Sequence, residues 1–171
     1  MSIASEDAQE LIDPQHLDRL ALCVDDEAAA AELLELRFAA LGALVIGHGA
    51  RYLPMATEEL ETAFDDFCTR SARRRRVLSK VAEFLGCQPD ATLLEVAERC
   101  APPFSERLSE LRDRLCEIRS RIEQLAGENS DLLGRRLALA DEALADAAGD
   151  EASPTYGRPS PSRPRLIRGV L

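Results

Sequence analysis

The chain has 171 residues and a formal net charge of −10, with no Trp and only five Phe and two Tyr. This length fits one domain plus a tail, and the scarcity of aromatic residues and of strand-like alternation indicates an all-α protein. The acidic balance disfavours nucleic-acid binding, because phosphate contacts need a basic face.

The cysteine pattern and the lack of long apolar runs indicate where in the cell the protein is located. The cysteines are odd in number and contain no CxxC pair, so neither a zinc site nor a disulfide framework is predicted. The chain starts with polar and acidic residues and has no apolar run long enough for a membrane span. We therefore expect a cytoplasmic protein without membrane insertion, without a cofactor, and with its cysteines acting as small apolar residues. The five are Cys23, Cys68, Cys87, Cys100 and Cys116.

The first helix is predicted to follow a flexible acidic N-terminus at residues 1–13. Asp13 is a favourable N-cap, and Pro14 fits the first helical turn. Apolar residues then recur at steps of three and four as far as Ile46, with Glu27 interrupting this seam. The seam consists of Leu17, Leu20, Val24, Ala31, Leu34, Phe38, Leu41 and Val45.

The second helix is predicted from Thr57 to Gly86, after a break that contains two glycines and Pro54. Its seam includes Ser71 and Arg74 among apolar residues. The arginine run 73–76 covers most of the helical circumference, so at least one arginine must point toward the bundle. For the run as a whole, a solvated face is favoured over an anion site. The seam is Leu60, Phe64, Phe67, Ser71, Arg74, Leu78, Val81 and Leu85.

The third helix is predicted over residues 103–147, after a connector at 87–101 that carries a short helix at 91–99. Pro103 fits a first helical position, and the apolar seam keeps alternating steps of four and three. The predicted fold is an all-α antiparallel bundle of three long helices at residues 14–149. The third seam consists of Phe104, Leu108, Leu111, Leu115, Ile118, Ile122, Leu125, Asn129 and Leu132.

The third helix is longer than the second, which predicts that its end projects from the bundle. If it runs back along the second helix, about 15 residues, or roughly 22 Å, extend beyond Leu132 or Leu133. This end carries an apolar stripe, which marks either a partner site or a surface covered by the first helix or by a second copy. The stripe is Leu133, Leu137, Ala140 and Leu144, widened by Leu139, Ala143 and Ala147.

Asn129 occupies a seam position on the third helix. A buried polar residue there fixes helix register at a cost in stability. The alternative is that Asn129 lies half solvated at the end of the bundle, where the cost is small.

The last segment, residues 150–171, is predicted to be a disordered, basic, Pro-rich tail, because its composition cannot form a packed core. Its lone Tyr156 is either incidental or a recognition anchor.

These features resemble the FlgN family of bacterial flagellar export chaperones. The resemblance lies in the helix order, with Arg74 followed by Val77 and Leu78, and in the small connector before the long last helix. It also includes the string IEQLAGENSDLL at 122–133, which is similar to an Asn-x-x-Leu-Leu pattern, and the later Tyr156-Gly157.

The resemblance implies that the chain binds the C-terminal helical segments of hook-associated proteins at the hook-filament junction. It implies that the chain keeps them from premature assembly and delivers them to the export gate. The implied client-binding residues lie late in the third helix, and Tyr156 would dock on the cytoplasmic domain of the gate. The client set is Asn129, Leu132, Leu133, Leu137, Ala140 and Leu144.

The sequence also bears on two other classes of function. The first is a structural coiled-coil protein, such as a homodimer, that self-associates through the stripe and has no client. An enzyme is not expected, because His16 and His48 have no companion residues at catalytic or metal-binding spacing. Phosphate-binding loops and nucleophile motifs are also absent from the sequence.

Overall fold

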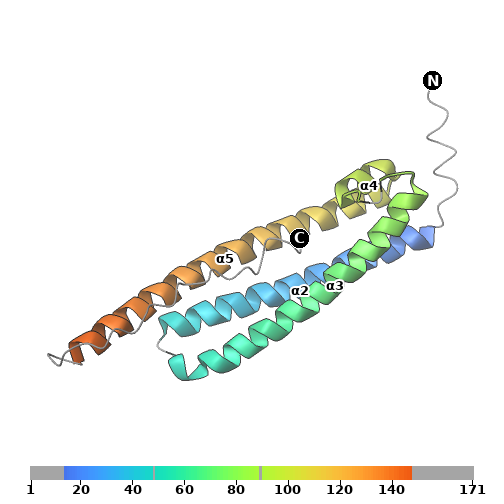
Figure 1. Ribbon diagram of the computed structural model, residues 1–171. Coiled ribbons are helices and arrows are strands. Elements are labelled where there is room, and N and C mark those ends of the chain that lie inside the picture. Colours follow the sequence, from blue (N-terminus) through green and yellow to red (C-terminus); the bar gives the residue numbers. More distant parts are fainter. Residues whose placement is uncertain (1–13, 48, 89, 148–171) are drawn as a thin grey trace.

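The computed structural model describes residues 14–47, 49–88 and 90–147, which form helices and no strand. This confirms the all-α fold, with three long helices and a projecting last helix (Figure 1). The predicted flexible segments, 1–13 and 150–171, lie outside the described residues. The elements are α2 (Pro14–Ile46), the 3₁₀ turn η1 (Ala50–Tyr52), α3 (Leu53–Phe84), α4 (Leu93–Arg99) and α5 (Phe104–Ala147).

The start of α3 differs from the prediction. Pro54 was expected to break the chain, but it occupies the first turn of α3, where a missing N–H leaves no intrahelical bond unmade. Thr57 therefore lies inside the helix rather than capping it, and its hydroxyl donates to the Leu53 carbonyl at 2.9 Å. The predicted boundary was wrong by one helical turn.

The end of α3 follows the prediction closely. Gly86 has a φ of 66°, a backbone conformation that favours glycine. Its N–H donates to Glu83 O at 3.1 Å, and the N–H of Cys87 reaches back to Ala82 O at 2.8 Å. This pair of bonds is the Schellman arrangement, which satisfies the last carbonyls and turns the chain toward α4.

The short helix α4 is held by a reciprocal cap. The Thr92 hydroxyl accepts from the Glu95 N–H at 3.3 Å, and the Glu95 carboxylate accepts from the Thr92 N–H at 2.6 Å. Two hydrogen bonds to the Glu95 carboxylate, from the Thr92 N–H first and then from the Thr92 hydroxyl at 2.9 Å, lower the pKa of Glu95. The sequence Thr-x-x-Glu therefore fixes where α4 begins.

α2 is the central long helix, and both α3 and α5 pack against it. Ion pairs join α2 to α3 in antiparallel register, from Arg37 with Glu59 to Asp26 with Arg73. In contrast, α5 runs parallel to α2, since Arg107 pairs with Asp18 near the start of α2, and Arg136 donates to Ile46 O at its end. The predicted pairing of the third helix with the second was wrong, because α5 packs on α2. A wide buried arc on α2 holds both neighbours.

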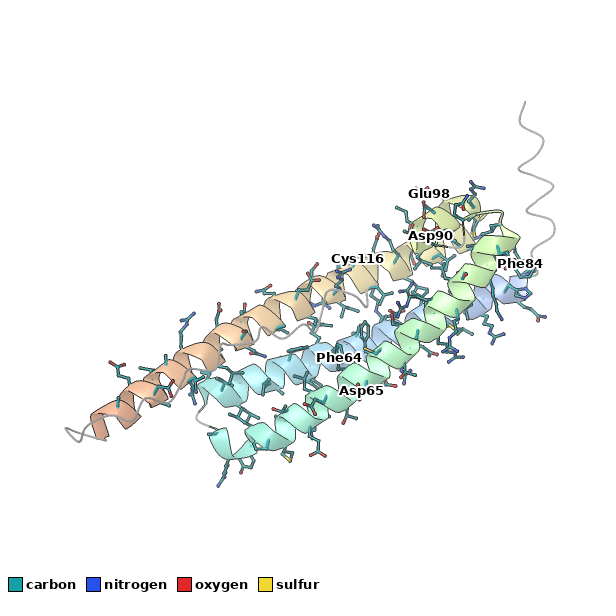
Figure 2. The ribbon with its side chains drawn as sticks, viewed as in Figure 1. Phe64, Asp65, Phe84, Asp90, Glu98 and Cys116 are labelled. Carbon is teal, nitrogen blue, oxygen red and sulfur yellow. The ribbon has the colours of Figure 1, made fainter. Side chains whose placement is uncertain are left out.

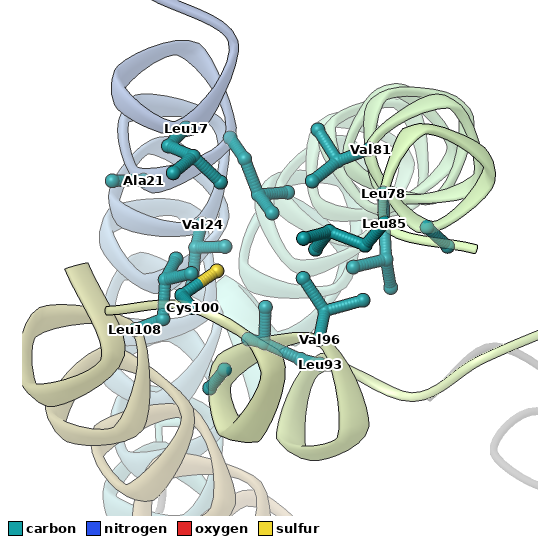
Figure 3. Packing of buried hydrophobic residues seen from close by; sticks show 13 residues of the cluster. Leu17, Ala21, Val24, Leu78, Val81, Leu85, Leu93, Val96, Cys100 and Leu108 are labelled. Carbon is teal, nitrogen blue, oxygen red and sulfur yellow. The ribbon is translucent and has the colours of Figure 1, made fainter. Parts of the chain in front are cut away.

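The core consists of two connected groups of apolar side chains. In the first group, α4 covers residues of all three long helices, including Leu17, Val24, Leu78 and Leu108 (Figure 3). The second group lies further along α2 and contains Leu34, Phe67, Ile118 and Ile122, with no residue from α4. The bundle therefore has a fourth helical element over only part of its length.

Candidate functional site

The end of α5 projects beyond α2 and α3 (Figure 1). Arg136 on α5 donates a hydrogen bond to the carbonyl of Ile46, the last residue of α2, at 3.2 Å. Residues 137–147 therefore continue for roughly 16 Å past the end of α2. The projection begins about one turn later than predicted, because α2 rather than α3 is the helix that α5 follows.

The predicted client-binding residues differ in exposure. Leu133, Leu137 and Ala140 are exposed, with Leu137 64% exposed. Leu132 is half-buried. The side chain of Leu144 and the whole of Tyr156 lie outside the described residues. Leu139 is also 64% exposed, but it lies on nearly the opposite side of α5 from Leu137, since two residues span about 200° of a helix.

Asn129 does not belong to the exposed surface. It is 5% exposed, and its amide donates to the carbonyl of Phe38 on α2 at 2.7 Å. Gly42, one turn further along α2, leaves the space that the Asn129 side chain fills. The polar seam position thus fixes the register of α5 on α2 and is unavailable to a client in this structure.

The Asn129 and Gly42 contact gives a first prediction. A Cβ added at Gly42 would overlap the Asn129 Oδ1 atom, so Gly42→Ala should destabilise the fold by about 1–3 kcal/mol in urea unfolding. Gly127→Ala on α5 is the control, because nothing lies within 4 Å of its added Cβ. That substitution should stabilise the exposed helix by about 0.5–1 kcal/mol. Equal effects of the two substitutions would contradict the packing of Asn129 against Gly42.

α3 and α5 both pack on α2 and lie less close to each other. Among the described residues, no α-carbon of α5 lies within 8 Å of one of α3, although side chains of both helices meet in the core. Five apolar residues that pack against the second core group are only half-buried. They are Phe38, Leu60, Phe64, Cys68 and Leu115.

A buried ion pair joins α2 to α3. Glu27 is fully buried, and its Oε2 accepts from Nε of Arg74, whose side chain is 14% exposed. The other oxygen, Glu27 Oε1, is buried without a hydrogen-bond partner. The expectation that one arginine of the run 73–76 points inward is confirmed by Arg74.

The ion pair lines a pocket of about 350 Å³ between α3, α4 and α5. The rest of the pocket is lined by apolar side chains and by arginines. The lining residues are Glu27, Arg74, Thr92, Leu93, Leu94, Arg112, Leu115, Cys116 and Arg119.

All five cysteines are free thiols, but they are not uniformly buried. Cys23 and Cys100 fit the expectation of small buried residues, whereas Cys116 on α5 is exposed (Figure 2). Burial and the nearby Asp65 raise the pKa of the Cys68 thiol on α3, outweighing the opposite effect of Arg75. Cys68 is half-buried, so Cys116 is the more exposed of these two thiols.

The described residues offer little that is typical of a reaction centre. No group of three or more His, Cys, Asp or Glu in them is placed to hold a metal ion. His16 is exposed and its ring lies 5.2 Å from that of Phe84, whereas His48 lies outside the described residues. None of the helices in the described ranges has the length and apolar character needed to cross a membrane.

Comparison with family models found no match, and searches of curated proteins and of solved structures found none either. The resemblance to the FlgN family therefore stays a prediction that depends on the residues quoted above.

Proposed function

We propose that the chain is a cytoplasmic export chaperone of the FlgN type. It would bind the C-terminal helical segments of hook-associated flagellar proteins and deliver them to the export gate. The observation that carries the proposal is the projecting end of α5, where Leu137 is exposed just beyond the hydrogen bond from Arg136 to α2 and Leu133 is exposed one turn before Leu137. Exposed apolar surface of this kind is typical of a protein-binding site.

The mechanism would be capture of an amphipathic helix. A client segment that is unfolded before export would fold its apolar face against the stripe of α5. Ordering the client on binding costs free energy, which keeps the affinity moderate and allows release. Tyr156 remains the proposed contact with the export gate, on the basis of the family resemblance alone.

A second candidate function is self-association without a client. It is favoured by another exposed stripe, on the face of α2 that points away from the core. This stripe contains Leu22, Leu33 and Leu36, which are 58%, 41% and 59% exposed. A parallel or antiparallel pair of α2 helices would bury it.

The test is a calorimetric titration with a synthetic peptide from the C-terminal helix of a hook-associated protein encoded in the same genome. We expect wild-type binding in roughly the micromolar range and no detectable binding by Leu137→Asp. Leu139→Asp is the matched control, because it changes an equally exposed leucine on the other side of the helix. It should bind like the wild type.

Two outcomes would contradict the proposal. One is a wild-type protein that binds no peptide. The other is equal loss of binding in the two variants, which would mean that the peptide recognises no particular side of α5. The helical circular dichroism of both variants should match the wild type, since both positions are exposed.

A further inference from the structure

A basic pocket lies where the start of α2 packs beside the end of α3 (Figure 1). It encloses about 390 Å³, and its lining contains four Arg or Lys side chains and one His but no Asp or Glu. Such a cluster of positive charge stands out on a chain with a net charge of −10. The basic residues are His16, Arg19, Arg73, Arg76 and Lys80.

Three of the four Arg and Lys side chains in this pocket form no ion pair with any described residue. They are Arg19, Arg76 and Lys80. Arg73 pairs with Asp26 at 3.3 Å, but both side chains are about half exposed, so this pair is weak. Because clustered like charges repel one another, the pocket favours an anionic group.

The segment that precedes α2 carries the opposite charge. Residues 1–13 contain four acids and no Lys or Arg. The acids are Glu6, Asp7, Glu10 and Asp13. The segment joins α2 at Pro14, and the pocket residues His16 and Arg19 follow in the first two turns of that helix. An acidic stretch of chain is therefore tethered directly beside the basic pocket.

The segment is long enough to reach every basic residue of the pocket. A proline disfavours a helical backbone at the residue before it, so the chain can turn away from the axis of α2 at Asp13. An extended chain spans about 3.3 Å per residue, so the residues before Asp13 reach roughly 40 Å. The stretch of α3 from Arg73 to Lys80 is only about 10 Å long.

We propose that residues 1–13 bind in the basic pocket of the same chain. Carboxylates of the segment would pair with Arg76 and Lys80. Because the segment is tethered, its effective concentration is about millimolar, and individually weak pairs are sufficient. The bound segment would keep other anions, such as nucleic acids, out of the pocket. This inference goes beyond the proposed function and does not depend on it.

An apolar contact at the edge of the pocket favours the same occupant. Phe84, near the end of α3, is 59% exposed, and its ring lies 5.2 Å from that of His16 (Figure 2). Leu11 and Ile12 come directly before the start of α2. With the segment in the pocket, these two side chains would cover Phe84 and remove apolar surface from water.

Other occupants fit less well. Residues 151–171 contain four Arg and one Glu, so their charge has the same sign as the pocket lining. The acidic segment of a second copy has the right charge but lacks the tether. The experiment below distinguishes it from the segment of the same chain.

Lys80 is the only lysine in the chain, which makes a cross-linking test specific. A carbodiimide joins a lysine amine directly to a carboxylate that lies in contact with it, and mass spectrometry of the digest identifies the joined residues. We expect Lys80 of the full chain to be joined to Glu6, Asp7 or Glu10, with a yield that falls as salt is added. Lys80→Arg keeps the charge but removes the reactive amine, so it should form none of these cross-links.

A charge variant gives an independent readout. Asp7→Asn/Glu10→Gln should free the amine of Lys80, so that it reacts with acetic anhydride at least about twice as fast as in the wild type. The control is Asp141→Asn/Glu142→Gln, which removes the same charges from exposed positions on α5. It should react at the wild-type rate.

The inference predicts cross-links from Lys80 to residues 1–13 within one chain, together with faster acetylation in the Asp7→Asn/Glu10→Gln variant alone. Cross-links of Lys80 confined to its own helix, for example to Glu83, would overturn it. Equal acetylation rates in the wild type and both variants would also overturn it. Cross-links that mainly join isotope-labelled to unlabelled chains in an equal mixture would identify a second copy as the occupant, which again overturns the inference.

Discussion

Arg74→Met should destabilise the fold by about 3–5 kcal/mol, because it leaves the buried carboxylate of Glu27 without a counter-charge. One oxygen of Glu27 already lacks a hydrogen-bond partner, so the substitution would leave the whole group unpaired. The free energy of unfolding should be measured by urea denaturation, with circular dichroism as the signal.

The neighbouring arginine provides a matched control. Arg73 also pairs with an acid of α2, Asp26, but both side chains are about half exposed. Arg73→Met should therefore change the free energy of unfolding by less than about 1 kcal/mol. The double variant Glu27→Leu/Arg74→Met should recover most of the stability, since an apolar pair can replace a buried ion pair. Equal losses in the two single variants would mean that Glu27 and Arg74 are not a buried pair.

Leu108→Ala should cost about 2–5 kcal/mol in the same measurement, because Leu108 is fully buried where α4 and α5 pack on α2 (Figure 3). Leu137→Ala makes the same chemical change on the same helix at an exposed position. It should stay within about 0.5 kcal/mol of the wild type. A large loss for Leu137→Ala would show that the stripe of α5 is covered in the free protein, as self-association through this stripe requires.

The helices could be predicted from the sequence because each carries a regular apolar seam and local stop signals. Pro14 and Gly86 mark a start and an end in the expected way. Pro54 was misread, since a proline is compatible with a break and equally with the first turn of a helix. Local chemistry alone does not choose between these two roles.

How the helices pair could not be read from the seams. Glu27 and Arg74 were both recognised as polar interruptions, but they lie 47 residues apart and the seams do not give the register between helices. The contact between Gly42 and Asn129 could not be predicted either, because it also depends on the register between α2 and α5. The projecting end of α5 was predicted from helix lengths, whereas its parallel packing on α2 depends on the wide apolar arc of α2.

The most direct test of the central claim, that the exposed side of α5 binds a client helix, is sedimentation velocity over a wide range of protein concentrations. It should be run with and without the hook-associated peptide, the peptide carrying a fluorescent label. We predict a species of constant size in the free protein and co-sedimentation of the peptide with wild type and Leu139→Asp, but not with Leu137→Asp. A free protein that forms larger species as its concentration rises, with no peptide bound, would contradict the chaperone account and favour self-association.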